Sequence, residues 1–347
     1  MSEVRLDVLQ PVEEQPPPTV EANPAQKVLR YVGPAVALAL IASASVVLWQ
    51  MITSIDYADV ERSIVHMPTW RIVAAFFFTG VGLVALSFYD LLALKAIRTR
   101  PTISSGRAVV GGLVANVFAN ALGLPLLTGG SARYRIYSMV GAGLSVVGRL
   151  TVMSWVTMWS GILLVLGLTL ALEPGDQEAV FGSHLIDRIV GVALIAALVG
   201  FVAWSAVRRR AVRIGGWSVR LPGALPVTGM ILAGALDLVA AAATLYVLLP
   251  ADVAPDIARY MVTYSIGLVA GILASTPGGI GVFEAAIVTG LGIADRPDVA
   301  AALILFRLIY FVAPLGIALA LLGFVELRHR RKQRLRRALG LGDDVTD

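Results

Sequence analysis

The chain has 347 residues, of which 57% are hydrophobic and only 15% charged, with a mean hydropathy of +0.81 and a formal net charge of +5. A soluble domain carries about a quarter charged residues, so this composition excludes an ordinary soluble fold. Cysteine is absent, which excludes a disulfide framework and a thiolate metal site. The three histidines, His66, His184 and His329, fall in or near predicted loops and helix ends, so we expect no metal site and no cofactor.

Residues 1–26 precede the first apolar segment and are too polar to insert into a membrane. They contain five prolines, at positions 11, 16, 17, 18 and 24, together with Glu13, Glu14 and Glu21. Such a composition is typical of a disordered tail. The features of a cleaved secretory signal are missing, so we expect the following hydrophobic helix to stay attached.

Apolar segments then follow one another through most of the chain. They cover residues 31–53, 70–97, 107–127, 131–148, 149–172, 181–207, 225–250, 257–276, 280–293 and 299–327. Several of them exceed the roughly 18 apolar residues that a membrane-spanning helix needs. The sequence therefore predicts an all-α polytopic membrane protein.

Two pairs of these segments are joined by double glycines. Gly129-Gly130 joins 107–127 to 131–148, and Gly278-Gly279 joins 257–276 to 280–293. The second member of each pair is too short or too polar to cross comfortably, although charge counting cannot distinguish a hairpin that dips in from one that crosses twice. We expect six full spans plus two glycine-hinged re-entrant or broken helix pairs.

The distribution of charge predicts the orientation, because cytoplasmic loops keep an excess of Lys and Arg. The basic groups are Lys95, Arg98, Arg100 and Arg107, then Arg208, Arg209, Arg210, Arg213 and Arg220, then the tail from Arg328 to Arg337. The alternate loops are acidic: Asp56, Asp59 and Glu61; Glu173, Asp176 and Glu178; Asp252 and Asp256; Asp295 and Asp298. Both termini are predicted to lie in the cytoplasm.

An internal duplication organises the chain. Asp90 precedes Gly130 by 40 residues, Asp237 precedes Gly279 by 42, and an arginine follows each pair of glycines, Arg149 in the first half and Arg307 in the second. An odd number of crossings in the first half would make the second an inverted repeat, an arrangement that points to a transporter site near the membrane midplane. The alternative is that the glycines only mediate helix packing.

This duplication divides the chain into a cytoplasmic tail at 1–26, a first membrane repeat at 27–172, a second inverted repeat at 173–327 and a basic cytoplasmic tail at 328–347.

Around the first double glycine, the sequence predicts a phosphate site. Pro125 is expected to end one helix, and Thr128 or Ser131 to cap the next. The free N–H groups of a helix N-terminus suit a phosphate, and Arg133 and Arg135 follow immediately. The alternative is that both arginines extend to the cytoplasmic interface.

The second break, at Gly278, Gly279 and Gly281, carries a carboxylate instead. Glu284 falls in the first turns of the following half-helix and is a candidate for substrate binding or translocation, with helix capping as the alternative. Asp237 lies near the middle of an apolar span, and Arg307 is its expected partner, since buried charges in membranes usually pair.

In the first half, Asp90 and Arg149 occupy the matching positions. They lie closer to the predicted cytoplasmic side, so an interfacial position is the alternative for both.

The stretches 129–137, 275–284 and 306–310 resemble the lysylphosphatidylglycerol synthase transmembrane family, which includes the flippase domain of the multiple peptide resistance factor. The likeness runs from about residue 31 to 328, and Pro-Gly-Gly-x-Gly-x-x-Glu is its most specific element. The resemblance implies a bacterial inner-membrane protein that moves anionic or aminoacylated phospholipids between leaflets. It places Asp90, Asp237 and Arg307 at charged positions tied to translocation, with Asp237 standing where a glutamate is usual.

We expect no enzymatic activity, because the family's soluble synthase domain follows the membrane part and residues 328–347 do not supply it. The expected partners are membrane phospholipids and a separate lipid-modifying enzyme, with no nucleic acid; the oligomeric state is open. One alternative is a non-transporting partner of a lipid-modifying or envelope-glycan enzyme. A remote one is an intramembrane aspartyl protease using Asp90 and Asp237.

Overall fold

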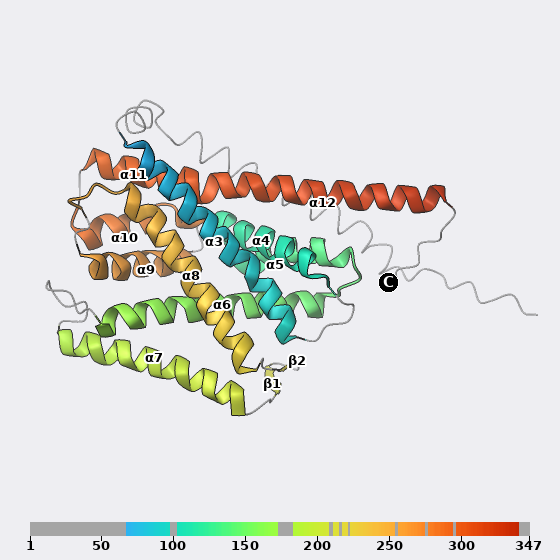
Figure 1. Cartoon of the computed structure of the whole chain (residues 1–347), viewed down its shortest axis with the longest axis horizontal. Coiled ribbons are helices and arrows are strands. Elements are labelled where there is room, and N and C mark those ends of the chain that lie inside the picture. The colour runs from blue at the N-terminus through green and yellow to red at the C-terminus, as the bar shows by residue number, and fades with distance from the viewer. Residues whose placement is uncertain are drawn as a thin grey trace, which may run out of the picture.

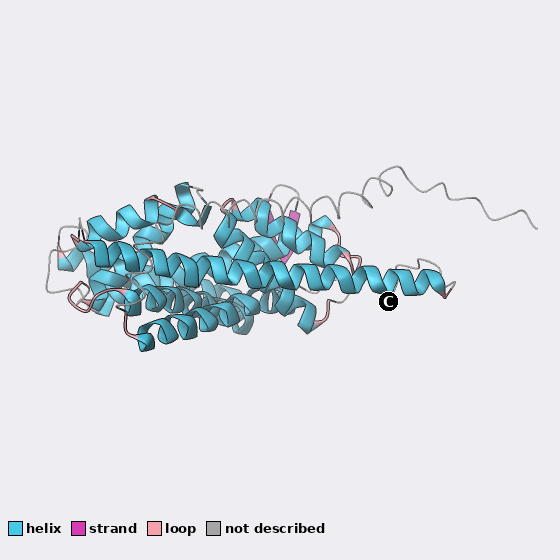
Figure 2. Ribbon diagram, turned by 90° about the horizontal axis from the view of Figure 1, so that it is seen from above, coloured by secondary structure: helices cyan, strands magenta, loops and turns pink. Residues whose placement is uncertain are grey.

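The computed structural model describes residues 67–97, 103–172, 183–207, 211–214, 217–220, 223–253, 256–274, 277–293 and 296–339. These residues form a bundle of helices with one small antiparallel hairpin (Figures 1 and 2). The all-α class predicted from the sequence is confirmed. The predicted tail 1–26 and the predicted span 31–53 lie outside the described residues.

The first half contains α3 (Thr69–Ala96), α4 (Ser105–Leu122), α5 (Pro125–Ser138) and α6 (Leu144–Leu172). Then come α7 (His184–Val207) and the hairpin of β1 (Ala211–Ile214) and β2 (Trp217–Arg220). The second half contains α8 (Ala224–Leu248), α9 (Ile257–Ala274), η1 (Pro277–Gly279), α10 (Val282–Leu291), α11 (Pro297–Arg307), η2 (Leu308–Val312) and α12 (Ala313–Ala338).

Six helices in the described part of the chain are long and apolar enough to cross a membrane. Five of them, α3, α6, α7, α8 and the continuous α11–α12, correspond to spans predicted from the sequence, and α9 is the sixth. The π-helix η2 joins α11 to α12 without a break. It ends just before Pro314, which lacks the N–H that an α-helix would need at that point.

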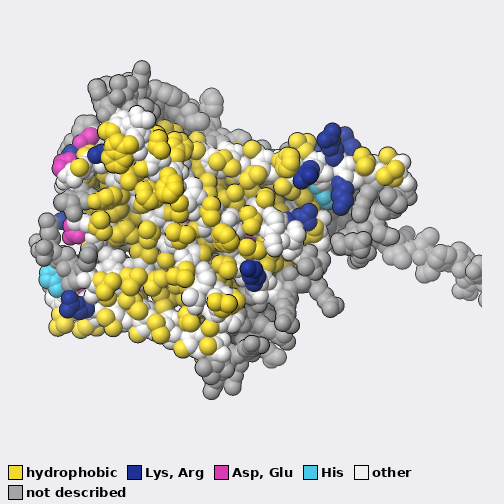
Figure 3. Space-filling model, in the orientation of Figure 1, with side chains coloured by type: hydrophobic (Ala, Val, Ile, Leu, Met, Phe, Trp, Pro, Cys, Tyr) yellow, Lys and Arg dark blue, Asp and Glu magenta, His cyan; other side chains and the backbone are white. Residues whose placement is uncertain are grey.

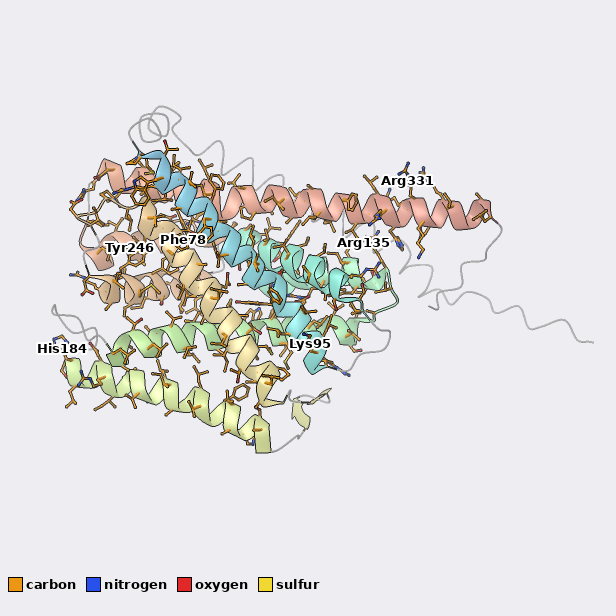
Figure 4. All side chains as sticks on the ribbon, viewed as in Figure 1. Phe78, Lys95, Arg135, His184, Tyr246 and Arg331 are labelled. Carbon is orange, nitrogen blue, oxygen red and sulfur yellow. The ribbon has the colours of Figure 1, made fainter. Side chains whose placement is uncertain are left out.

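The surface of the bundle is that of a protein surrounded by lipid. Hydrophobic side chains cover the middle of the face in Figure 3, whereas acidic side chains lie at one end and the largest group of Lys and Arg at the other. Figure 4 shows Arg135 and Arg331 at one end of the molecule and His184 at the other. Exposed Leu, Ile and Val side chains continue along α7, including Leu185, Ile189 and Val199. The long axis of the bundle therefore crosses the apolar layer.

At the acidic end, Arg296 joins two loops. Its guanidinium donates to Asp252 at 2.5 Å and to Asp298 at 2.6 Å, and so links the α8–α9 connection to the start of α11. The hydrogen bond from Arg296 holds the pKa of Asp252 below its usual value. This ion pair is exposed, so it contributes little to stability.

The two helical hairpins occupy different ends of the bundle. In Figure 1, α9 and α10 lie at the left and α4 and α5 nearer the right, while α3 and α8 cross in front and pack closely together. With 14 residues in α5 and 10 in α10, these helices span only about 21 Å and 15 Å, against about 30 Å for the hydrocarbon core. Neither return helix is long enough to cross.

The first break lies earlier in the chain than predicted. Gly123 (φ 70°) and Leu124 (φ 46°) separate α4 from α5, and Pro125 begins α5 rather than ending α4. Gly129, Gly130 and Ser131 all lie inside α5, so the predicted hinge at Gly129-Gly130 is wrong. The predicted helix cap is wrong as well, since Thr128 donates its hydroxyl to the Gly123 carbonyl at 2.9 Å.

Gly129 has a packing role instead. A Cβ at this position would lie 3.0 Å from the Ala115 carbonyl oxygen and 3.1 Å from the Ala119 side chain. The glycine therefore lets α5 approach α4 closely, as small residues do in membrane helix pairs.

The second break is where the sequence predicts it. Gly278, Gly279 and Gly281 have φ values of 58°, 69° and 83°, a region that residues with a Cβ rarely adopt. α10 then starts at Val282, and its N-terminus is closed by a hydrogen bond of 2.8 Å from the Gly281 N–H to Glu284. Glu284 therefore caps α10, as the alternative reading of this residue expects, and its part in translocation stays a prediction.

α6 and α8 cross at a contact between two glycines. A Cβ on Gly161 would lie 2.1 Å from the backbone carbon of Gly234, and a Cβ on Gly234 would lie 2.2 Å from the Thr157 carbonyl oxygen. The backbones touch, so this contact fixes the separation of the two helices.

We predict that Gly161→Ala destabilises the protein, because the added methyl group forces α6 away from α8. Overpacking of this kind costs about 1–3 kcal/mol. Thermal unfolding in detergent measures the effect. The matched control is Gly200→Ala on α7, where no atom lies within 4 Å of the new Cβ. Equal unfolding temperatures for the two variants would contradict the close crossing.

Candidate functional site

A cavity lies where the two helix breaks approach each other inside the bundle. The space inside it that a water-sized sphere can occupy is about 90 Å³. The first break contributes Gly123, Leu124 and Pro125 to its wall, and the second contributes Gly278 and Gly279. Helices α3, α4, α6, α8, α9, α10 and α11 and the π-helix η2 complete the lining. The cavity therefore lies between hairpins that belong to different ends of the molecule.

Asp237 on α8 supplies the one charged side chain among the described residues that line the cavity. Its Oδ2 accepts a hydrogen bond of 3.0 Å from the Tyr89 hydroxyl of α3. Its Oδ1 is buried and accepts no hydrogen bond from the described part of the protein. A buried carboxylate oxygen without a donor is costly, so Asp237 has binding capacity that the protein itself leaves unused.

Aromatic rings form the side of the cavity next to α9 and α11. Phe283 stacks on Phe306 with 5.7 Å between ring centroids, and Phe306 stacks on Tyr310 at 5.2 Å. Tyr264 meets Phe283 edge to face at 5.3 Å. The π-helix places Tyr310 and Phe311 on this wall. Such rings present apolar surface and negative π-faces, which suit a cationic group.

Arg307 does not pair with Asp237, so the predicted pair is wrong. Its Nε donates to Glu284 at 2.6 Å, and its Nη1 donates to the carbonyl oxygen of Gly278. The guanidinium also lies 5.0 Å from the centroid of the Phe311 ring. Arg307 therefore joins α11 to the second break and to α10, and its charge is balanced by Glu284.

A closed polar network fills the core of the first half. Asp90 is fully buried and accepts hydrogen bonds from Arg133 Nε at 3.0 Å and from the Tyr137 hydroxyl at 2.6 Å. Arg133 also donates to Asn116 at 2.9 Å and to Ser154 at 2.6 Å. The network joins α3, α4, α5 and α6 and leaves 2% or less of either charged side chain exposed. In this conformation Arg133 is not free to take a phosphate.

The remaining predicted residues lie away from the cavity lining. Arg135 forms an ion pair with Glu326 of α12, and Glu326 also accepts from Arg330 at 2.8 Å. Arg149 is half-buried on α6 and forms no hydrogen bond or ion pair with any residue that the structure describes. Their part in translocation stays a prediction.

The sequence analysis missed most of the residues that surround Asp237. Tyr89 and Tyr264, which are buried, and Tyr310, which is half-buried, line the cavity with it, and Phe306 precedes Tyr310 by one helical turn. The sequence does contain a signal for this aromatic wall. Tyr260 and Tyr264 are four residues apart, as Phe306 and Tyr310 are, and this spacing places both members of a pair on one face of a helix. Asn116, an amide inside an apolar helix, was the corresponding signal for the buried network.

The fold and cavity define a class of protein: a polytopic helical membrane protein with two broken hairpins around a central, carboxylate-bearing cavity. No family model matches the chain. Comparison with known proteins nevertheless relates it to bacterial proteins, one of which is an inner membrane protein.

An uncharacterized protein of Synechocystis sp. is 29% identical over 268 residues, which cover 76% of this chain and 82% of that protein. The inner membrane protein YbhN of Escherichia coli is 26% identical over 275 residues, covering 72% and 81% of the two chains. Phosphatidylglycerol lysyltransferase of Staphylococcus aureus is 24% identical over 293 residues, covering 83% of this chain but only 33% of the lysyltransferase. The chain is thus related to an inner membrane protein and to a segment that makes up about a third of a lipid-modifying enzyme.

We predict that Arg133→Gln lowers stability by about 3–5 kcal/mol, because it leaves the charge of Asp90 buried without a partner. The double variant Asp90→Asn with Arg133→Gln should lose less than the sum of the two single variants. Unfolding in one detergent at constant pH measures this coupling.

Arg149→Gln is the matched control for this experiment, since Arg149 has no partner in the described structure and its loss should change stability little. Strictly additive effects of the Asp90 and Arg133 substitutions would contradict the buried pair.

Proposed function

We propose that the protein moves phospholipids between the two leaflets of a membrane, with the headgroup passing through the cavity at Asp237 and the acyl chains remaining in lipid. One observation carries this proposal: a cavity that contains the Asp237 carboxylate lies between two helix breaks that enter from different ends of an otherwise apolar bundle. Discontinuous helices of this kind mark substrate sites in transporters. The similarity to a phosphatidylglycerol lysyltransferase supports a lipid as the cargo.

The cavity favours one of the two predicted cargo classes. A phosphate needs cationic or N–H donors, but Arg133 is bound by Asp90, Arg135 by Glu326 and Arg307 by Glu284. A positively charged headgroup finds the free oxygen of Asp237 and the aromatic wall. We therefore propose aminoacylated or other positively charged phospholipids rather than anionic ones.

The proposal includes an inverted repeat. A long helix, a short hairpin and a second long helix occur in this order as α3, α4–α5 and α6, and again as α8, α9–α10 and α11–α12. With the basic end of the bundle in the cytoplasm, the first hairpin enters from the inside and the second from the outside. Each leaflet then has one broken hairpin that reaches the cavity.

A leaflet-exchange assay in liposomes tests the function. We predict that the purified protein speeds the exchange of tail-labelled lysylphosphatidylglycerol, and that Asp237→Asn slows this exchange at least about tenfold, since a hydrogen bond to a charged group contributes about 1.5–3 kcal/mol. Arg307→Ala should also slow exchange, because it releases the Gly278 carbonyl and α10 from α11.

Asp252→Asn is the matched control, because Asp252 is an exposed carboxylate at the acidic end and far from the cavity lining. It should exchange lipid at the native rate. The opposite outcome is that neither the native protein nor Asp237→Asn speeds the exchange of any phospholipid. That result would contradict the proposal and support a non-transporting partner of a lipid-modifying enzyme.

A further inference from the structure

The charge in the cavity is unbalanced. Asp237 brings one carboxylate, the hydroxyls that approach it belong to the neutral Tyr89 and Tyr310, and its Oδ1 is buried with no donor at hydrogen-bond distance among the described residues. An isolated carboxylate in an apolar site either binds a cation or takes up a proton. When no cation is bound, a proton is the simplest group to neutralise Asp237.

The neighbouring groups do not remove this requirement. The ionisable side chains that line the cavity with Asp237 are Tyr89 on α3, Tyr264 on α9 and Tyr310 on η2, and the charged groups next to them in the chain or the fold include Asp90 on α3, Glu284 on α10 and Arg307 on α11. The tyrosines are neutral donors, Asp90 is bound to Arg133, and Glu284 to Arg307. On the other packed helices, α6 carries only Arg149, and α7 has its ionisable residues His184, Asp187 and Arg188 in its first two turns.

We infer that Asp237 binds a proton and a cationic headgroup in alternation, so that the protein exchanges one proton for one positively charged lipid. This inference rests on the proposed function and adds its energy source. When the headgroup enters, the O–H bond of the Asp237 carboxyl group breaks, the proton passes to water, and the ammonium group pairs with the carboxylate. When the headgroup leaves into the other leaflet, Asp237 takes a proton from water on that side.

A directional consequence follows from this stoichiometry. One positive charge replaces another, so the exchange is electrically neutral and responds to a pH gradient but not to a membrane potential. Protons that run down their gradient drive the lipid towards the leaflet that faces the acidic compartment. At equilibrium the ratio of lipid in the two leaflets equals the ratio of proton concentrations, about tenfold for each pH unit.

The test uses the full chain in liposomes with a tail-labelled ethyl-phosphatidylcholine, a phospholipid whose fixed positive charge cannot titrate. A pH gradient is imposed, and a membrane-impermeant quencher measures the label in the outer leaflet. We expect enrichment in the leaflet on the acidic side, approaching tenfold per pH unit and lost when a proton ionophore dissipates the gradient. Rapid exchange that stops at the ratio found without a gradient overturns the inference while leaving the proposed function intact.

Two variants separate coupling from folding. Residual exchange by Asp237→Asn should not respond to the gradient, whereas Asp252→Asn, at an exposed carboxylate outside the cavity lining, should retain the enrichment. A gradient-driven enrichment that persists in Asp237→Asn would overturn the role of this residue.

If the native protein exchanges no lipid, the proposed function fails, and proton release decides the inference separately. The same lipid is added to the detergent-solubilised protein in weak buffer. Each protein molecule in which Asp237 is protonated beforehand should release one proton when it binds a lipid, so the release approaches about one proton for each lipid bound. Binding without proton release at any pH tested would overturn the exchange.

Discussion

Inside a membrane the backbone cannot hydrogen-bond to water, so every N–H and C=O group freed by a helix break must find a partner in the protein. Both breaks meet this requirement with side chains. Thr128 donates to the Gly123 carbonyl at the first break. At the second, Arg307 donates to the Gly278 carbonyl and Glu284 accepts the Gly281 N–H. These contacts stabilise the chain in its broken, non-helical form at both breaks. The cavity lies between the two breaks and therefore depends on them.

The same requirement separates structural charges from the one available for function. Asp90 and Arg133 neutralise each other in a closed network, and Glu284 and Arg307 do so while they stabilise the second break. Asp237 has neither a charged partner nor a freed backbone group to satisfy. The fold therefore does not explain the free-energy cost of placing the Asp237 carboxylate in this apolar site. A cationic ligand or a proton is the simplest group that would offset that cost.

The sequence predicted the class and the second break well, because composition and glycine conformation are local properties. Gly278 and Gly279 need φ values that other residues rarely adopt, whereas Gly129 serves packing, and the sequence alone does not distinguish these uses. Gly123 followed by a proline at 125 was the better signal for the first break. The partner of Arg307 could not be read from the sequence, because it depends on how the second break folds α10 back against α11.

Photo-crosslinking with a cationic phospholipid that carries a diazirine on its headgroup tests most directly whether a headgroup enters the cavity between the breaks. After illumination of the protein in liposomes, mass spectrometry locates the labelled peptides. The account predicts adducts on cavity residues of both hairpins, such as Leu124 and Leu268, that decrease in Asp237→Asn. Adducts confined to the outer apolar face, such as Leu185 and Ile189 of α7, would contradict it.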